Sequence, residues 1–243
     1  MFEAGVFLID KPVGITSFAV VSRLRRILQM KKVGHAGTLD PFATGLLVLC
    51  AGRPATRLIS GLMDGDKEYL ATLLLGVETE TLDTEGAITG CQSVGTIAAS
   101  TIEECLLHFR GKQLQTPPAY SALKHQGKPL YYYARKGIAV TKEARAVDIK
   151  LLERTDGNAA VGGDGATLAI RVICSKGTYI RSLAADIGRH LGCGAHLIQL
   201  RRIRSGCFSL DGSLGWDELG GEQALEHCMN AMISVEGACK LLQ

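Results

Sequence analysis

Residues 34–41 read Gly-His-Ala-Gly-Thr-Leu-Asp-Pro and place one acid, Asp40, between a glycine-rich turn and a proline. Gly34 and Gly37 let backbone and ligand approach closely, because glycine has no Cβ atom. Pro41 then fixes the exit of the turn. A long uncharged run, PFATGLLVLCAG, follows Asp40. The pattern indicates a loop that presents a carboxylate to a ligand, although a tight structural turn would show the same pattern.

Strand and helix patterns surround this loop without a regular β-α-β alternation. Thr16 or Ser17 can cap a helix to about Gln29, whose apolar face we expect to include Phe18. Thr101 and Glu104 form a capping-box pattern ahead of a second helix. The other expected elements are strands at 6–10, 67–75, 146–153, 167–174 and 196–206 and a helix at 180–191. The fold class is therefore α+β, with a central mixed or largely antiparallel sheet flanked by helices.

Bulk composition indicates a globular chain. Of its 243 residues, 47% are hydrophobic and 21% are charged, which is ample for a core. No uncharged apolar stretch approaches the roughly 18 residues that span a bilayer, and the charged N-terminus does not resemble a signal peptide. The eight cysteines are scattered and form no CxxC pair. Free thiols favour a reducing compartment, so we expect a cytoplasmic protein without membrane contact.

Charge is unevenly distributed along the sequence, although the net charge is only +3. Residues 20–35 hold five Lys/Arg and no acid, residues 108–145 hold eight against one acid, and residues 171–204 hold seven against one. Three such blocks favour basic faces that bind a polyanion. The alternative is that acids from elsewhere in the chain lie among these cations in space and cancel them.

Tyr69, Tyr179 and Arg181 are further candidates for chemistry. Tyr179 and Arg181 sit two apart at an expected strand-to-helix turn, where a guanidinium could pair with a carboxylate such as that of Asp40 and keep it ionised. Binding of a phosphate or a place on the helix surface would explain Arg181 equally well. Tyr69 lies in an apolar strand, where it is either a core residue or a ring that stacks on a nucleobase.

Residues 113–142 look like an excursion from the core. The stretch YSALKHQGKPLYYYARKG within it interleaves tyrosines with lysines and arginine. Aromatic rings among cations suit an RNA surface, and an amphipathic helix is the plainer interpretation.

His190, Cys193 and His196 have a spacing that suggests metal binding, but glycines interrupt the segment and no fourth ligand is evident. No nucleotide-binding glycine motif and no Gly-x-Ser-x-Gly elbow occurs.

Taken together, these segments resemble the bacterial tRNA pseudouridine-55 synthase family. GHAGTLDP, ATGLL, KEY, YSALKHQGKPLYYYARKG, SKGTYIRSL and LGCGAHLIQLRR occur in the family's order between about residues 5 and 215. The resemblance implies the pseudouridine synthase catalytic fold over 1–215, with 113–142 as a thumb-like insertion that closes over RNA. It also implies a tRNA T-arm as partner and no metal or cofactor. The oligomeric state stays open, with a monomer as the default expectation.

Site residues follow from the same resemblance. Asp40 matches the catalytic aspartate, for which attack at C1′ of the ribose, attack at C6 of the uracil and a glycal route have all been considered. Tyr69 matches the tyrosine that stacks on the target base and is the candidate general base, and Arg181 matches the arginine that pairs with the catalytic carboxylate. The expected substrate-binding residues are His35, which holds the flipped nucleotide, and Tyr179, Lys11 and Leu200 in the same pocket.

One departure from the family pattern concerns the C-terminus. Many bacterial members continue into a small RNA-binding domain of the PUA type, whereas here a short acidic segment of 27 residues, with five acids and one lysine, follows Trp216. We therefore expect 216–243 to be a short tail too small for an independent domain.

Three rival functions stay open at this point. One is a tRNA folding helper that binds the T-loop with little or no catalysis. The second keeps the chemistry but applies it to another RNA stem-loop. The third is a metal-dependent hydrolase built on His190, Cys193 and His196.

Overall fold

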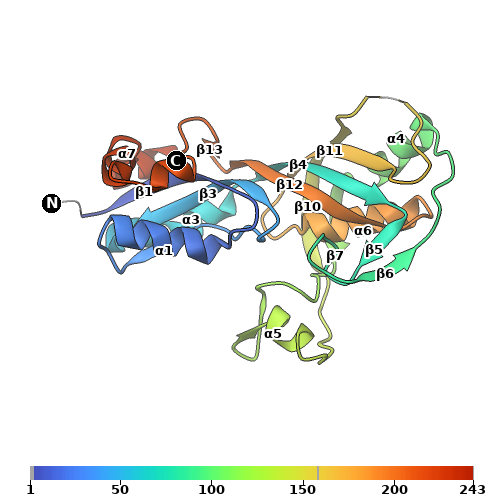
Figure 1. Cartoon of the computed structure of the whole chain (residues 1–243), viewed down its shortest axis with the longest axis horizontal. Helices are drawn as coiled ribbons and strands as arrows, with labels where there is room; N and C mark the ends of the chain where they lie inside the picture. Colours follow the sequence, from blue (N-terminus) through green and yellow to red (C-terminus); the bar gives the residue numbers. More distant parts are fainter. Residues whose placement is uncertain (1–2, 158, 243) are drawn as a thin grey trace. The chain divides into compact units, whose positions relative to one another are not determined.

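The computed structural model describes residues 3–157 and 159–242, and the chain forms two compact units. Unit 1 combines the chain up to Leu70 with the chain from Leu200 onward, and unit 2 is Ala71–Gln199. Two strands, β4 (Lys67–Leu75) and β12 (Ala195–Ser205), contribute residues to both units. Each unit has its own part of the sheet and its own helices (Figure 1).

Unit 1 is built on β1 (Gly5–Lys11) and β3 (Thr44–Ala51), which pair antiparallel along their full lengths. The end of β12 joins β3 in parallel, with Arg202 opposite Gly45. Two short strands complete this part of the sheet, β2 (Val33–His35) on β3 and β13 (Phe208–Ser209) on β12. The sheet is therefore mixed, as the sequence predicted.

Helices cover both faces of the unit 1 strands because β1 and β3 are apolar on both sides. One face packs its alternate residues Val6, Leu8, Leu46 and Val48 against a helical layer that includes Leu62. The helices of unit 1 are α1 (Ser17–Ile27), α2 (Arg53–Thr56), α3 (Ile59–Asp64), α7 (Ala224–Asn230) and α8 (Val235–Leu241), with a 3-10 turn η1 (Asp217–Leu219). Residues after Trp216 thus belong to a compact unit.

In unit 2 the neighbouring strands follow the order β12, β4, β11, β10, β7. Its strands β7 (Gly111–Gln115), β10 (Arg145–Arg154) and β11 (Thr167–Cys174) pair antiparallel. A separate hairpin is formed by β5 (Val77–Thr79) and β6 (Ile88–Cys91). The helices are α4 (Ala99–His108) and α6 (Ile180–His190).

The segment between β7 and β10 extends away from the other elements of unit 2 (Figure 1). It contains a small hairpin of β8 (Lys124–His125) and β9 (Lys128–Pro129) and the short helix α5 (Leu130–Ala134). We call residues 113–142 the insertion.

Two local expectations were wrong. Phe18 is 65% exposed and lies beside the guanidinium of Arg25, because the buried face of α1 is formed by Val20, Val21 and Leu24. Thr101 does not cap α4, because that helix already begins at Ala99. Thr16 does cap α1, with its hydroxyl accepting a hydrogen bond from the Ala19 amide.

Candidate active site

Asp40 lies in the loop between β2 and β3 of unit 1 and is half-buried. Its backbone is well ordered by hydrogen bonds: the Ala43 amide donates to the Asp40 carbonyl at 3.1 Å, and the Gly14 amide donates to the Pro41 carbonyl at 2.8 Å. Gly37 has a φ of +95°, a conformation that side chains with a Cβ rarely adopt. The glycine is therefore needed for the turn that brings the chain to Asp40.

Lys11 lies directly beside this loop and is completely buried. Its ammonium donates hydrogen bonds to the carbonyls of Pro12, Ile15 and Pro41 at 2.9, 2.8 and 3.2 Å. Three carbonyl acceptors offset part of the cost of burying the charge. Lys11 thus holds the backbone immediately after Asp40.

His35 ends β2, and its pKa lies below 6.5 because the ring is buried and because the positive charge of Arg202 opposes protonation. Among the described residues its buried Nδ1 has no hydrogen-bond partner. The imidazole is therefore neutral at pH 7, which suits a ring that stacks on a base.

Two further predicted residues belong to unit 1. Tyr69 lies on β4 and Leu200 on β12, and both are buried. Unit 1 thus contains five of the seven predicted site residues: Lys11, His35, Asp40, Tyr69 and Leu200.

Unit 2 contains the other two, Tyr179 and Arg181, at the start of α6. The side chain of Gln115, at the end of β7, fixes the backbone there. It accepts a hydrogen bond from the Tyr179 amide at 2.8 Å and donates one to the Tyr179 carbonyl at 3.0 Å. Two bonds from one buried amide leave this turn little freedom.

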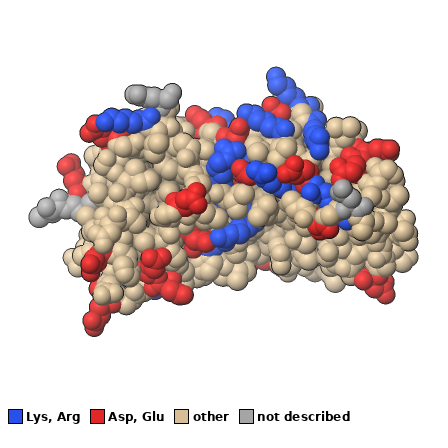
Figure 2. Space-filling model, turned by 90° about the horizontal axis from the view of Figure 1, so that it is seen from above, with Lys and Arg blue, Asp and Glu red and all other residues tan. Residues whose placement is uncertain are grey.

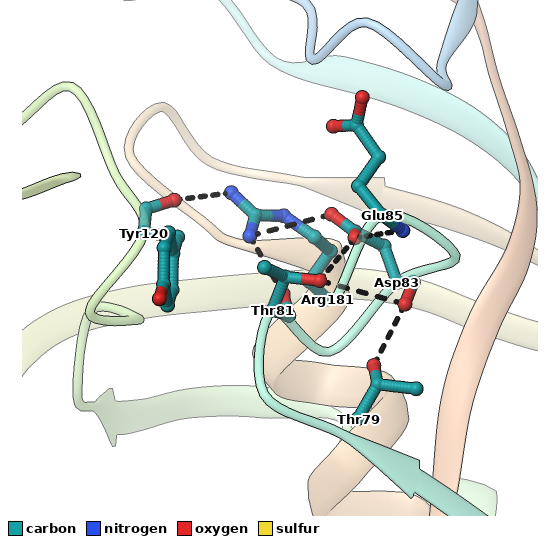
Figure 3. Close-up of polar contacts among 6 residues, drawn as sticks. All are labelled: Thr79, Thr81, Asp83, Glu85, Tyr120 and Arg181. Carbon is teal, nitrogen blue, oxygen red and sulfur yellow. Dashed lines mark hydrogen bonds and ion pairs between the residues drawn. The ribbon is translucent and has the colours of Figure 1, made fainter. Parts of the chain in front are cut away.

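Arg181 is almost completely buried and joins three segments of unit 2 (Figure 3). Its guanidinium donates to the carbonyls of Thr81 and Tyr120, each at 2.8 Å. It also forms an ion pair with the carboxylate of Asp83 at 3.5 Å. Because Tyr120 belongs to the insertion, one side chain ties the insertion to the Thr81–Asp83 turn.

Asp83 is itself held by its own turn. Its carboxylate accepts hydrogen bonds from the Thr81 hydroxyl at 2.5 Å and from the Glu85 amide at 2.9 Å, and the Thr79 hydroxyl donates to its carbonyl at 2.7 Å (Figure 3). Leu82 has a φ of +63°, which is uncommon for a residue with a side chain. The turn thus aims a buried carboxylate at Arg181.

The insertion presents its aromatic rings together with cations. The ammonium groups of Lys128 and Lys136 lie 4.4 and 4.6 Å from the ring centre of Tyr132. Hydrogen bonds from Lys136 and Lys128 lower the pKa of the Tyr132 hydroxyl. Within the described parts of the chain, no carboxylate pairs with Lys124, Lys128, Arg135 or Lys136. These cations are therefore available to phosphates.

The block 171–204 differs from the insertion, because most of its cations have acidic partners. Arg189 pairs with Asp186 at 2.6 Å, and Arg201 with Asp10 at 2.6 Å. On the face shown in Figure 2, acidic side chains lie next to basic ones. For this block the alternative of cancelling charges is the better description. In the described parts of the chain no carboxylate pairs with the exposed Arg26, Lys31 or Lys32, so the block 20–35 keeps its basic character together with the insertion.

The three residues with metal-like spacing have other contacts. His190 stacks on His108 with ring centres 4.7 Å apart, and His196 Nδ1 lies 2.8 Å from the Val77 carbonyl. Over residues 3–157 and 159–242, no three His, Cys, Asp or Glu side chains are placed to hold a metal ion. Nor does any helix in that part of the chain have the length and apolar character to cross a bilayer.

Two hollows of about 460 and 290 Å³ lie beside the β5–β6 hairpin, lined among others by Cys91 and Gln92. None of the seven predicted site residues lines either hollow.

Sequence reasoning missed four buried polar residues that hold predicted site residues or their loops: Ser17 and Arg202 in unit 1, and Asp83 and Gln115 in unit 2. A signal existed for one of them. Arg202 is two residues from Leu200 on the same strand, so strand alternation places both side chains on one face of the sheet. The others depend on partners more than 20 residues away in sequence and leave no local signal.

Family models match most of the chain. Residues 25–180 match the N-terminal domain of the TruB family pseudouridylate synthases, and residues 181–234 match the tRNA pseudouridylate synthase B C-terminal domain. A tRNA pseudouridine synthase B of Desulfotalea psychrophila is 64% identical over all of this chain and 98% of its own length. One of Chromobacterium violaceum is 51% identical over 86% of this chain and 66% of its own.

Solved structures agree on the fold. A crystal structure of a Cbf5-Nop10-Gar1 complex contains a chain that superposes with a TM-score of 0.71 at 30% identity. The match covers 98% of this chain and 62% of that one. An H/ACA RNP bound to a substrate RNA containing 2′-deoxyuridine gives 0.67 at 28% identity, over 98% and 61% of the two chains. Motif order, fold and full-length identity agree, and the chain therefore belongs to the TruB family of pseudouridylate synthases.

Proposed function

We propose that this chain converts the T-loop uridine at position 55 of tRNA to pseudouridine, with Asp40 as the catalytic carboxylate. The observation that carries the proposal is the 64% identity, over the whole chain, to a protein named tRNA pseudouridine synthase B. The half-buried position of Asp40 in an ordered, glycine-containing loop supports it, because a reacting carboxylate must be both reachable and fixed.

The reaction is an isomerisation. The N1–C1′ bond breaks, the freed uracil turns, a C5–C1′ bond forms, and the proton on C5 is lost while N1 gains one. No atom or electron is gained or lost overall, so the reaction needs no net oxidant, reductant or energy carrier, and we propose that it proceeds without a metal or cofactor. Attack of Asp40 at C1′, attack at C6 and a glycal route all require the same placed carboxylate.

The other roles are carried over from the family resemblance. Tyr69 stacks on the uracil and is the candidate general base, and Arg181 is the predicted partner of the catalytic carboxylate. His35, Tyr179, Lys11 and Leu200 form the substrate-binding set. The neutral imidazole of His35 fits stacking on a flipped nucleotide, because extrusion of a base costs a few kcal/mol that stacking can offset.

The partner we propose is the tRNA T-arm, gripped by the insertion. Its Lys and Arg side chains without acidic partners supply phosphate contacts, and Tyr132, which has two ammonium groups near its ring, adds an aromatic group to this cationic surface. We also propose that 1–215 acts as the catalytic domain and that 216–243, whose described residues pack within unit 1, forms no independent domain. We further propose that the protein works as a cytoplasmic monomer.

The test uses a T-arm stem-loop RNA with tritium at C5 of the target uridine. Wild-type protein should release the tritium, and Asp40→Asn should bind the RNA equally well but release none. Asp211→Asn, which neutralises an exposed acid of unit 1, is the matched control and should keep full activity. Binding by wild type without release, from both the stem-loop and whole tRNA, would instead support the tRNA folding helper.

A further inference from the structure

Buried side chains hold the loop that carries Asp40. They bind residues that precede and follow the aspartate in the sequence. Lys11 binds the carbonyl of Pro41, the residue after it. On the other side, Ser17 binds Leu39, and Arg202 binds Gly37 and Thr38. These side chains come from β1, α1 and β12, so three separate elements meet under one loop.

Ser17 makes two hydrogen bonds to one residue. Its hydroxyl donates to the Leu39 carbonyl at 2.9 Å and accepts from the Leu39 amide at 2.9 Å. Ser17 is the first residue of α1 and is buried, and the capping of that helix is supplied by Thr16 instead. The hydroxyl of Ser17 therefore serves the loop rather than its own helix.

Arg202 is the largest fully buried side chain of the described residues. Its guanidinium donates to the carbonyls of Leu46, Gly37 and Thr38 at 2.8, 3.1 and 3.4 Å. No ion pair to a carboxylate accompanies it in the described parts of the chain. A buried cation without an ion pair is costly. Here the guanidinium donates its hydrogen bonds to carbonyls of the Asp40 loop and of β3, the strand that follows it.

The backbone is shaped to bring Arg202 this close. Gly45 on β3 faces Arg202 on β12 and has a φ of +98°. A Cβ atom at Gly45 would lie 2.3 Å from the Arg202 carbonyl oxygen, closer than atoms can approach. Glycine at this position thus lets β12 run close enough for the guanidinium to reach under residues 37 and 38.

We propose that Ser17 and Arg202 are positioning residues for the isomerisation. They fix the peptide groups before Asp40 and so hold its carboxylate in the reacting geometry, without touching the substrate themselves. The inference rests on the proposed role of Asp40.

The physical need for such restraint follows from the loop's own sequence. Gly34 and Gly37 permit close approach to a ligand, but glycines also give the free backbone many conformations. A misplacement of about 1 Å in a reacting group can cost on the order of 100-fold in rate. Hydrogen bonds from two buried side chains to three successive residues, 37–39, remove that freedom before the RNA arrives.

The first test is Ser17→Ala, with Ser205→Ala as matched control. Ser205 is also buried, but its hydroxyl has no hydrogen-bond partner among the described residues. Tritium release would be followed in single turnovers with saturating enzyme in excess over the stem-loop RNA, so that an unfolded fraction of protein does not change the rate constant. We expect a loss of about 10-fold or more for Ser17→Ala, an unchanged rate for Ser205→Ala, and RNA dissociation constants within about twofold of wild type for both.

The second test is Arg202→Lys, with Arg204→Lys on the same strand as control. A lysine keeps the charge but cannot span three carbonyls as the planar guanidinium does. We expect the single-turnover rate to fall by on the order of 100-fold for Arg202→Lys, with RNA affinity retained and Arg204→Lys near wild type. If Arg202→Lys does not fold, the single-turnover rate of Ser17→Ala alone tests the positioning role.

Two results would overturn the inference in different ways. If the wild type is active but Ser17→Ala and a folded Arg202→Lys react at the wild-type rate, the positioning role is refuted. The same holds if both variants lose RNA affinity in proportion to their loss of rate. In either case the proposed function still stands. A wild-type chain that releases no tritium from stem-loop or whole tRNA would remove the proposed function, and this inference with it.

Discussion

Arg181 and Asp83 form an ion pair in which the side chains are only 4% and 2% exposed and the closest N–O distance is 3.5 Å. The pair lies within unit 2 and links the start of α6 to the turn after β5. Loss of one member of a buried pair leaves the other charged group without its counterpart, which is more costly than the pair itself is stabilising.

Asp83→Asn is therefore expected to lower the free energy of unfolding by on the order of 3 kcal/mol and to slow the reaction at least about tenfold, because Arg181 loses an anchor. Urea unfolding and tritium release measure the two effects. Glu153→Gln is the control, since its pair with Arg171 is about 40% exposed on both sides and should contribute less than about 1 kcal/mol. Equal behaviour of the two variants would refute the special role of Asp83.

Gln115→Ala removes both hydrogen bonds to the backbone of Tyr179. We expect a loss of stability of about 1–3 kcal/mol and a slower reaction, because the turn that carries Tyr179 and Arg181 is released. Gln113→Ala, two residues earlier on β7, removes a side-chain bond to the Phe109 carbonyl and leaves that turn untouched. A rate that falls equally in both variants would show that β7 as a whole matters, rather than Gln115.

Lys128→Gln should weaken binding of the T-arm RNA without changing the single-turnover rate at saturating enzyme. Removal of one phosphate contact reduces the slope of log K against log salt by about one. Lys240→Gln, an exposed lysine of α8 paired with Glu236, should leave both affinity and slope unchanged. Filter binding across a salt series checks this prediction, and an unaltered slope for Lys128→Gln would contradict it.

His35 links stability to pH. Burial and the charge of Arg202 hold its pKa in the folded protein below 6.5, so between that folded value and 6.5 the unfolded chain binds more protons than the folded one. The contribution of neutral His35 to the free energy of unfolding should therefore be fully present above pH 6.5 and should decrease on acidification through this window. NMR titration of the imidazole should give a midpoint below 6.5, and His35→Gln should flatten this part of the stability curve. A midpoint above 6.5 would contradict the burial argument.

Local pattern in the sequence was enough to predict several elements. The strand at 67–75 and the helix beginning at Ile180 follow from apolar periodicity and agree with β4 and α6. An apolar residue near the start of a helix suggests a place in the core, but Phe18 is exposed because the buried side of α1 begins at Ser17 and Val20.

The polar network around the site could not be predicted in the same way. Arg201 and Arg202 are neighbours in a basic run, yet one pairs with Asp10 near the surface and the other is fully buried under backbone carbonyls. The alternation of side chains along β12 places these two neighbours on opposite faces of the sheet. Their charge alone would predict that both lie on the surface. The role of Asp83 likewise depends on a distant residue, because its ion-pair partner Arg181 lies 98 positions further along the sequence.

The hydrogen bond between Gly37 and Arg202 joins residues 165 positions apart. A contact that closes so long a loop forms late, because the chain must lose much entropy before it is made. An unfinished chain that lacks β12 therefore contains every atom of the Asp40 loop but not the guanidinium beneath it. The Asp40 loop of a growing chain therefore gains its hydrogen bonds from Arg202 only after β12 has been synthesised.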